Sequence, residues 1–290
     1  MPPVLIADTA DGPVDLGPAL SIFDPVYVGI DEFGQPVRVP LIYRNMLIGG
    51  EPGAGKSALL NALVAHAALA VDCRLCLLDA KRVELGQWRK CADAFVGPSL
   101  PGAMSLLTRI QIMMDRRYDY LEACERRKVK PGDVFTPYVL AIDELAYYAA
   151  TVGKKADRED FSALVRDLVA RGRAVGIIVI AATQRPSSDI IPTSLRDLFA
   201  WRFAGRCTTT ASSDIVLGHG WAQLGWSANT ISPTNPGAGL LIAENGSPQL
   251  LKVAYLDDAV CKAIAKYAAT LRATAGAVDR PKLRPVPVAA

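Results

Sequence analysis

The chain has little of what a disulfide-bonded or metal-binding protein needs. It contains only two histidines, His66 and His219, and its six cysteines are scattered along the sequence. Cys73 and Cys76 form a lone CxxC pair, with no second pair to complete a four-ligand metal site. Residues three positions apart on a strand point to opposite faces, so we expect both cysteines to be packing residues.

Long hydrophobic runs and a strong charge of one sign are also missing. The longest apolar stretches, 58–71 and 174–183, are far shorter than the roughly 20 residues that span a bilayer. The N-terminus has no basic region followed by an apolar core, so we predict a cytoplasmic protein that would need a partner to bring it to a membrane. Because the formal net charge is only +3, any contact with nucleic acid must be local.

What is present is a complete phosphate-binding loop at residues 50–57. Its pattern is GxxxxGK followed by Ser, between an apolar run and a helical pattern. The glycines let backbone amides point at a phosphate, Lys56 would reach the β and γ oxygens, and the Ser57 hydroxyl would bind Mg²⁺. We therefore predict that the chain binds ATP and Mg²⁺. The residues expected to contact the nucleotide are Gly50, Glu51, Pro52, Gly53, Ala54, Gly55, Lys56, Ser57 and Ala58.

Strands and helices alternate along the rest of the chain, which contains 51% hydrophobic residues, ample for a buried core. This alternation implies a doubly wound α/β fold, with a mostly parallel sheet and helices on both faces. We predict an N-terminal arm at 1–25, one domain at 26–275, and a proline-rich basic tail at 276–290 that is disordered. The elements expected inside the domain are a β-hairpin at 26–41, strands at 74–79, 138–143, 176–183, 200–206, 239–243 and 250–255, and helices at 57–71, 102–127, 158–172 and 257–275.

Two of the predicted strands end in polar residues suited to ATP hydrolysis. The apolar strand at 138–143 ends in Asp143 and Glu144, which fits a Walker B motif. Asp143 would assist Ser57 in holding Mg²⁺, and Glu144 would act as the general base that polarises the attacking water. The strand at 176–183 delivers Gln184 to the same carboxyl edge, where it could sense the γ-phosphate or orient water.

Phosphoryl transfer also gains from a positive group on the γ-phosphate, which a neighbouring subunit often supplies. The candidates are Arg116, Arg117, Arg171 and Arg173. Arg171 and Arg173 precede the strand that ends near Gln184, which favours a position at a subunit edge. For any single arginine of this set, a solvated helix position is an equally good reading.

Taken together, these residues resemble the motor domain of the FtsK/SpoIIIE family of double-stranded DNA translocases, over residues 28–246. Six motifs occur in the family order, at 29–37, 49–61, 78–85, 114–118, 137–146 and 173–186. The resemblance implies a RecA-like fold and a homo-oligomeric ring, typically hexameric, that hydrolyses ATP between subunits and pulls double-stranded DNA through a central channel. Lys81 and Glu84, within the third motif, would lie near the nucleotide or the subunit edge.

The sequence departs from larger family members, because no membrane anchor, long linker or C-terminal winged-helix module is evident. Its compact form is closer to actinobacterial plasmid-transfer translocases. Candidate DNA contacts are Lys154, Lys155 and Arg158, although a solvated loop explains them equally well. Two other functions stay open: a protein-secretion ATPase of the type VII kind, which binds peptides, and a regulatory switch that binds ATP without transport.

Overall fold

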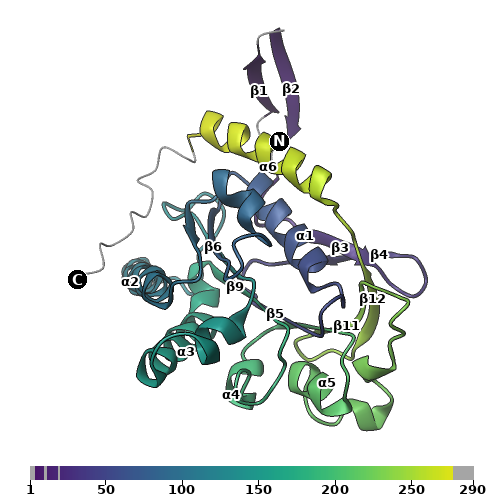
Figure 1. Ribbon diagram of the computed structural model, residues 1–290. Coiled ribbons are helices and arrows are strands. Elements are labelled where there is room, and N and C mark those ends of the chain that lie inside the picture. Colours follow the sequence, from purple (N-terminus) through teal and green to yellow (C-terminus); the bar gives the residue numbers. More distant parts are fainter. Residues whose placement is uncertain (1–3, 10–11, 19, 277–290) are drawn as a thin grey trace.

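We describe the chain from a computed structural model covering residues 4–9, 12–18 and 20–276, with side chains described from residue 20 onward. The strands and helices are drawn in Figure 1. The strands are β1 Val4–Thr9, β2 Gly12–Pro18, β3 Val26–Ile30, β4 Pro36–Val39, β5 Met46–Gly49, β6 Arg74–Leu78, β7 Ala94–Val96, β8 Tyr138–Ile142, β9 Ile177–Thr183, β10 Trp201–Gly205, β11 Ala238–Ala243 and β12 Gln249–Val253. The α-helices are α1 Lys56–Leu69, α2 Leu100–Ala123, α3 Lys155–Arg171, α4 Thr193–Arg196, α5 Thr210–Leu217 and α6 Asp258–Thr274.

One mixed sheet of ten strands organises the domain, in the order β4-β3-β12-β11-β10-β5-β9-β8-β6-β7. The strands from β10 to β7 are parallel neighbours, which confirms the predicted mostly parallel α/β fold. β11, β12, β3 and β4 extend the sheet from β10 as antiparallel neighbours. The β3–β4 pair is the hairpin predicted at 26–41, whereas the sequence did not indicate the direction of β11 and β12. Because β5, β9 and β8 are parallel, the residues that follow them meet at one edge of the sheet.

Helices cover both faces of this sheet (Figure 1). On one face, α2, α3, α4 and α5 pack over a core that includes Met114 and Phe161. On the other face, α1 and α6 pack over a second core that includes Leu63 and Phe203. Along β5 the side chains alternate between the two cores, as the pleat of a strand requires. The strand before the phosphate-binding loop is therefore fixed from both sides.

The predicted strands and long helices are present, with boundaries that differ by a few residues. The helix expected at 102–127 begins at Leu100, because the hydroxyl of Ser99 accepts a hydrogen bond from the Gly102 amide at 3.2 Å. β7 was not predicted, since three residues are too few to show a period. The short helices α4 and α5 were also missed. Cys73 and Cys76 are buried in different cores, which confirms that they pack on opposite faces.

A buried arginine joins α6 to the rest of the domain. Arg272 is 1% exposed and donates hydrogen bonds to the Ala70 carbonyl at 2.9 Å and the Cys73 carbonyl at 2.8 Å. Its guanidinium also forms an ion pair with Asp93 at 2.8 Å. Asp93 in turn accepts a hydrogen bond from the Leu75 amide at 2.8 Å, so one network links α6, the end of α1 and the edge of β6.

The N-terminal segment forms an antiparallel pair, β1 with β2, which extends beyond α6 in Figure 1. The predicted boundaries at residues 25 and 275 stay predictions, and the tail expected at 276–290 lies, from residue 277 on, outside the described residues. Within the described parts of the chain, no helix is both long enough and apolar enough to cross a membrane.

Candidate active site

The phosphate-binding loop connects β5 to α1 in the conformation that its glycines allow. Gly53 and Gly55 have φ values of 78° and 89°, in the left-handed region that favours glycine. A Cβ atom on Gly55 would lie 2.4 Å from the Cα of Gly237, so only glycine fits there. α1 begins at Lys56 directly after Gly55, which places the helix N-terminus at the loop as predicted.

Lys56 occupies a buried position at the start of α1. Its side chain is 6% exposed, and its ammonium donates a hydrogen bond to the Glu51 carbonyl at 2.5 Å. Burial lowers the pKa of Lys56 to about 8, while the nearby Glu144 carboxylate raises it. A desolvated ammonium of this kind gains stability from an anionic ligand such as a phosphate.

The acidic residue at the end of β8 fits a bound cation. Asp143 is 6% exposed, and its Oδ2 atom has no hydrogen-bond partner in the described structure. Burial raises the pKa of Asp143 to about 7, and the Lys81 ammonium offsets part of that rise. A buried carboxylate oxygen without a partner is costly unless a cation or a donor reaches it, so the donor set of Asp143 and the Ser57 hydroxyl suits Mg²⁺.

Glu144 is held by the end of the neighbouring strand β9. Its Oε1 atom accepts a hydrogen bond from the Thr183 hydroxyl at 2.7 Å, and its Oε2 atom accepts one from the Gln184 amide at 3.0 Å. Thr183 is fully buried, so this contact is shielded from water. The structure thus brings together Glu144 and Gln184 as the sequence predicts, and it adds Thr183, whose role the sequence analysis did not assign.

The end of β6 contributes a segment shaped by Asp79. This fully buried carboxylate accepts hydrogen bonds from the amides of Lys81, Arg82 and Leu85 at 3.0, 2.8 and 2.9 Å. The turn that it stabilises carries the Lys81–Glu84 ion pair, at 3.4 Å. Glu84 lines the cavity described next, which agrees with its predicted place near the nucleotide.

A cavity of about 740 Å³ lies over the phosphate-binding loop. From the loop, it is lined by Pro52, Gly53, Gly55, Lys56, Ser57 and Ala58. Glu84 and Gln184 lie on one flank. The opposite flank is built by Pro236, Gly237, Lys252, Val253 and Tyr255, none of which the sequence analysis assigned to the site. No motif marks them, and only the position of β11 and β12 in the sheet brings them to the loop.

Three predicted residues of the loop play a structural part instead of lining the cavity. Glu51 forms an ion pair with Arg206 at 2.8 Å, and its amide donates to the Arg206 carbonyl at 2.9 Å. Ala54 is 3% exposed. Gly50 packs against the backbone of Gly205, because a Cβ atom added to Gly50 would lie 3.0 Å from the Gly205 carbonyl oxygen. These contacts fasten the loop to the end of β10.

The candidate arginines do not gather in this cavity. Arg117 is 2% exposed and donates to the carbonyls of Val175 and Thr136, so its proposed action on another subunit is wrong. Arg171 forms ion pairs with Asp167 and Asp115. Arg173, just before β9, pairs with Glu244 at 2.7 Å, at the edge of the sheet opposite to the phosphate-binding loop.

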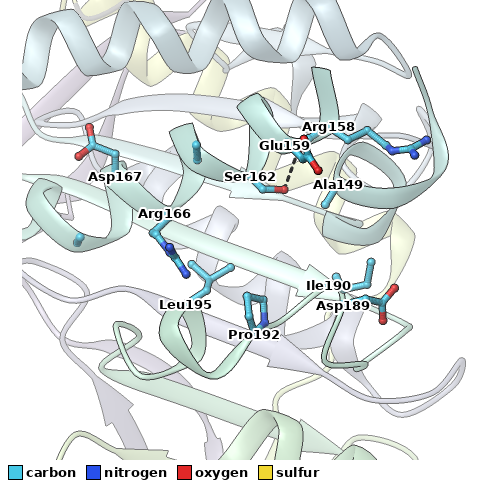
Figure 2. A pocket seen from close by; sticks show the side chains of 12 residues that line it. Ala149, Arg158, Glu159, Ser162, Arg166, Asp167, Asp189, Ile190, Pro192 and Leu195 are labelled. Atoms are coloured by element: carbon cyan, nitrogen blue, oxygen red, sulfur yellow. Dashed lines mark hydrogen bonds between the residues drawn. The ribbon is translucent and has the colours of Figure 1, made fainter. Parts of the chain in front are cut away.

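A second cavity, of about 540 Å³, lies between α3 and residues 189–195 (Figure 2). In Figure 2, Ser162 and Arg166 of α3 face Ile190, Pro192 and Leu195 across the opening, whereas Arg158 extends toward the loop before α3 and donates a hydrogen bond to the Gly153 carbonyl at 3.1 Å. Lys154 and Lys155 are exposed at the start of α3, next to this cleft. The cleft also contains Glu159, Asp167 and Asp189, so its charge is mixed.

The sequence matches a known family. Residues 7–146 match the description of the FtsK/SpoIIIE family. Among curated proteins, the chain is 32% identical over 195 residues to a DNA translocase FtsK of Chlorobaculum tepidum, covering 60% of this chain and 23% of the relative. It is 32% identical over 210 residues to the DNA translocase FtsK of Treponema pallidum, covering 67% and 26%. The chain thus spans about a quarter of the length of these relatives.

Solved structures share the fold. The pCW3 conjugation coupling protein TcpA, in its monomer form with ATPγS, aligns with a TM-score of 0.71 at 19% identity, covering 91% of this chain and 81% of that one. The cytoplasmic domain of the type VII secretion ATPase EccC of Thermomonospora curvata aligns with a TM-score of 0.67 at 19% identity, covering 86% and 31%. At these identities the likeness is one of architecture, the RecA-like P-loop ATPase fold.

Proposed function

We propose that this chain is a member of the FtsK/SpoIIIE family, whose description matches residues 7–146, and that it is an ATP-hydrolysing motor that moves double-stranded DNA. One observation carries the proposal: Lys56, Asp143, Glu144 and Gln184, from three parallel strands, converge at one edge of the sheet beside a cavity of about 740 Å³. A phosphate-binding loop with an intact general base is suited to turnover and not only to binding.

The residues would divide the work of hydrolysis as follows. The loop amides and Lys56 would hold the triphosphate, and Mg²⁺ held by Ser57 and Asp143 would neutralise charge on the phosphates. Glu144 would accept a proton from the attacking water, because its carboxylate is fixed by β9. Gln184, which lines the cavity, would orient that water or contact the γ-phosphate.

The DNA contacts in this proposal are Lys154, Lys155 and Arg158. Lys155 begins α3, has a side chain that is 82% exposed, and forms an ion pair with Glu159, which lines the second cleft. Lys154 directly precedes it, and Arg158 lines the same cleft (Figure 2). Exposed ammonium and guanidinium groups contact phosphates without reading bases, so binding should weaken steeply as salt increases. The nearby Arg185, which is 67% exposed, belongs to the segment that follows β9 and Gln184.

The proposal includes a homo-oligomeric ring, typically of six copies, in which Arg173 of one copy would reach the nucleotide of the next. Its place at the opposite edge of the sheet excludes a role at its own loop and favours one in trans. A membrane-anchored partner would recruit the ring where DNA crosses a membrane. Transfer of plasmid DNA is the biological setting that the architectural likeness to a conjugation coupling protein supports.

The deciding experiment is steady-state ATP hydrolysis by the wild type and Glu144→Gln, with and without long duplex DNA at low salt. We expect DNA to stimulate hydrolysis by the wild type and to have no effect on the variant. Hydrolysis that is indifferent to DNA would contradict the translocase. Stimulation by substrate peptides in its place would favour a secretion ATPase, the alternative that the architectural likeness to a type VII secretion ATPase supports.

A further inference from the structure

The nucleotide cavity extends further than phosphates and catalytic residues require. In the sheet, β5 lies between β9, with β8 and β6 beyond it, and β10, with β11 and β12 beyond it. Gln184 and Glu84 come from the first flank, next to Asp143 and Glu144. Because hydrolysis occurs at the γ-phosphate, that end of the triphosphate must face the first flank. The nucleoside end must then face the flank of β11 and β12.

The second flank has a fixed shape. A Cβ atom on Gly55 would lie 2.4 Å from the Gly237 Cα, so the loop and this flank are in close contact, and the Gly237 carbonyl accepts a hydrogen bond from the Val253 amide at 2.9 Å. The Lys252 ammonium donates to Asn235 Oδ1 at 2.5 Å and to the Pro236 carbonyl at 2.6 Å. Lys252 of β12 therefore stabilises the loop that contains Asn235 and Pro236, and its ammonium already has hydrogen-bond partners in the absence of a ligand.

Tyr255 completes this flank with an exposed aromatic ring. It follows β12 by two residues, lines the cavity, and is 79% exposed. An aromatic ring exposed to water is stabilised when another group covers it, and the two faces of the Tyr255 ring are free to stack against a planar group such as a nucleotide base. The neighbouring lining residues Pro236, Gly237 and Val253 offer apolar atoms and backbone, which suit a sugar and a base edge.

We propose that Tyr255 is the stacking platform for the base of the bound nucleoside triphosphate, with Val253 and Gly237 beside the ribose. The assignment rests on the proposed nucleotide function and specifies which residues receive the nucleoside part. Stacking holds any base through its π face, so Tyr255 contributes affinity for the nucleoside without reading hydrogen-bond patterns. A triphosphate that lacks a base gains nothing from Tyr255.

The test compares two ligands on matched variants, all in the Glu144→Gln background so that ATP is not consumed. Calorimetric titrations with Mg²⁺ measure the Kd of ATP and of inorganic tripolyphosphate for the parent, Tyr255→Ala and Tyr255→Phe. Tyr255→Ala should weaken ATP binding about tenfold and leave tripolyphosphate binding unchanged. Tyr255→Phe, which keeps the ring, should bind both ligands like the parent.

Phe33→Ala is the matched control, because Phe33 is 78% exposed but does not line the cavity. Unchanged ATP affinity in Tyr255→Ala would overturn the assignment, as would an equal loss of affinity for ATP and tripolyphosphate. A parent that binds tripolyphosphate and ATP equally well would also overturn it while leaving the phosphate-binding loop supported. A parent that binds neither ligand would overturn the proposed function itself.

Discussion

The Thr183 hydroxyl lies 2.7 Å from Glu144 Oε1, and Gln184, which directly follows this last residue of β9, lines the nucleotide cavity. Thr183→Val keeps the shape of the side chain and removes the donor, so Glu144 should lose its alignment. We expect kcat for ATP hydrolysis to fall about tenfold with little change in KM. Thr183→Ser, which keeps the hydroxyl, should retain most of the activity.

A double variant separates this positioning role from a general loss of packing. If Thr183 acts through Glu144, then adding Thr183→Val to Glu144→Gln should reduce hydrolysis no further. Independent, additive losses would contradict the positioning role. Equal damage by Thr183→Val and Thr183→Ser would do the same.

Substitutions of Lys56 and Glu144 should impair different steps, ATP binding in the first case and ATP hydrolysis in the second. Lys56→Ala removes a charge-assisted contact with the phosphates and should weaken ATP binding about 10- to 100-fold. Glu144→Gln should bind ATP like the wild type and hydrolyse it poorly. Titration with a fluorescent ATP analogue measures both, and Lys90→Ala, an exposed lysine outside the cavity, is the control. Equal loss of binding in the two variants would contradict the assigned roles.

Asp143 should make the ligand-free protein sensitive to pH. Burial raises its pKa to about 7, so the folded state binds the proton more tightly than the unfolded state does. The free energy of unfolding should therefore fall as the pH rises from about 4 to about 7 and stay lowered above that window. Asp143→Asn has no such proton, so this part of the pH dependence should disappear.

Urea unfolding at pH 5 and pH 8, without nucleotide or Mg²⁺, measures this effect. At pH 8 we expect Asp143→Asn to be more stable than the wild type by on the order of 1–2 kcal/mol, although it should bind Mg²⁺-ATP more weakly. An identical pH dependence in both proteins would show that Asp143 is not desolvated as described.

Arg173 is expected to act on the nucleotide of a neighbouring copy. Arg173→Ala should then lower ATP hydrolysis at least about a hundredfold without weakening ATP binding. Mixing Arg173→Ala with Lys56→Ala should restore activity, because intact Arg173 of one variant would meet an intact loop of the other. Glu244→Ala tests the alternative: if the Arg173–Glu244 ion pair is only structural, this variant should lose as much activity as Arg173→Ala, and mixing should restore nothing.

Arg272 should matter for stability and not for hydrolysis. Arg272→Ala leaves Asp93 and three carbonyl groups without this buried partner, which should cost about 3–5 kcal/mol of folding free energy. Lys262→Ala, at an exposed position of the same helix, should cost little. Urea unfolding compares the two, and a loss below about 1 kcal/mol for Arg272→Ala would contradict this role.

The sequence was informative where local chemistry decides the structure. The loop at 50–57 and the strand ending in Asp143 could be located because each carries its pattern within a few residues. The residues at 236–255 could not be assigned, since they reach the loop only through the order of the sheet, which no local pattern encodes. Arg117 was misjudged for a related reason: its burial depends on contacts with Thr136 and Val175, distant along the chain.

The cavity straddles β5, and its two flanks are strands that the chain builds from different segments, 74–183 on one side and 201–255 on the other. A nucleoside triphosphate that contacts both flanks would link these two parts of the sheet non-covalently. Binding would therefore restrict the movement of these two flanks relative to each other. The rigidity of the sheet would then depend, in each cycle, on whether a nucleotide is bound.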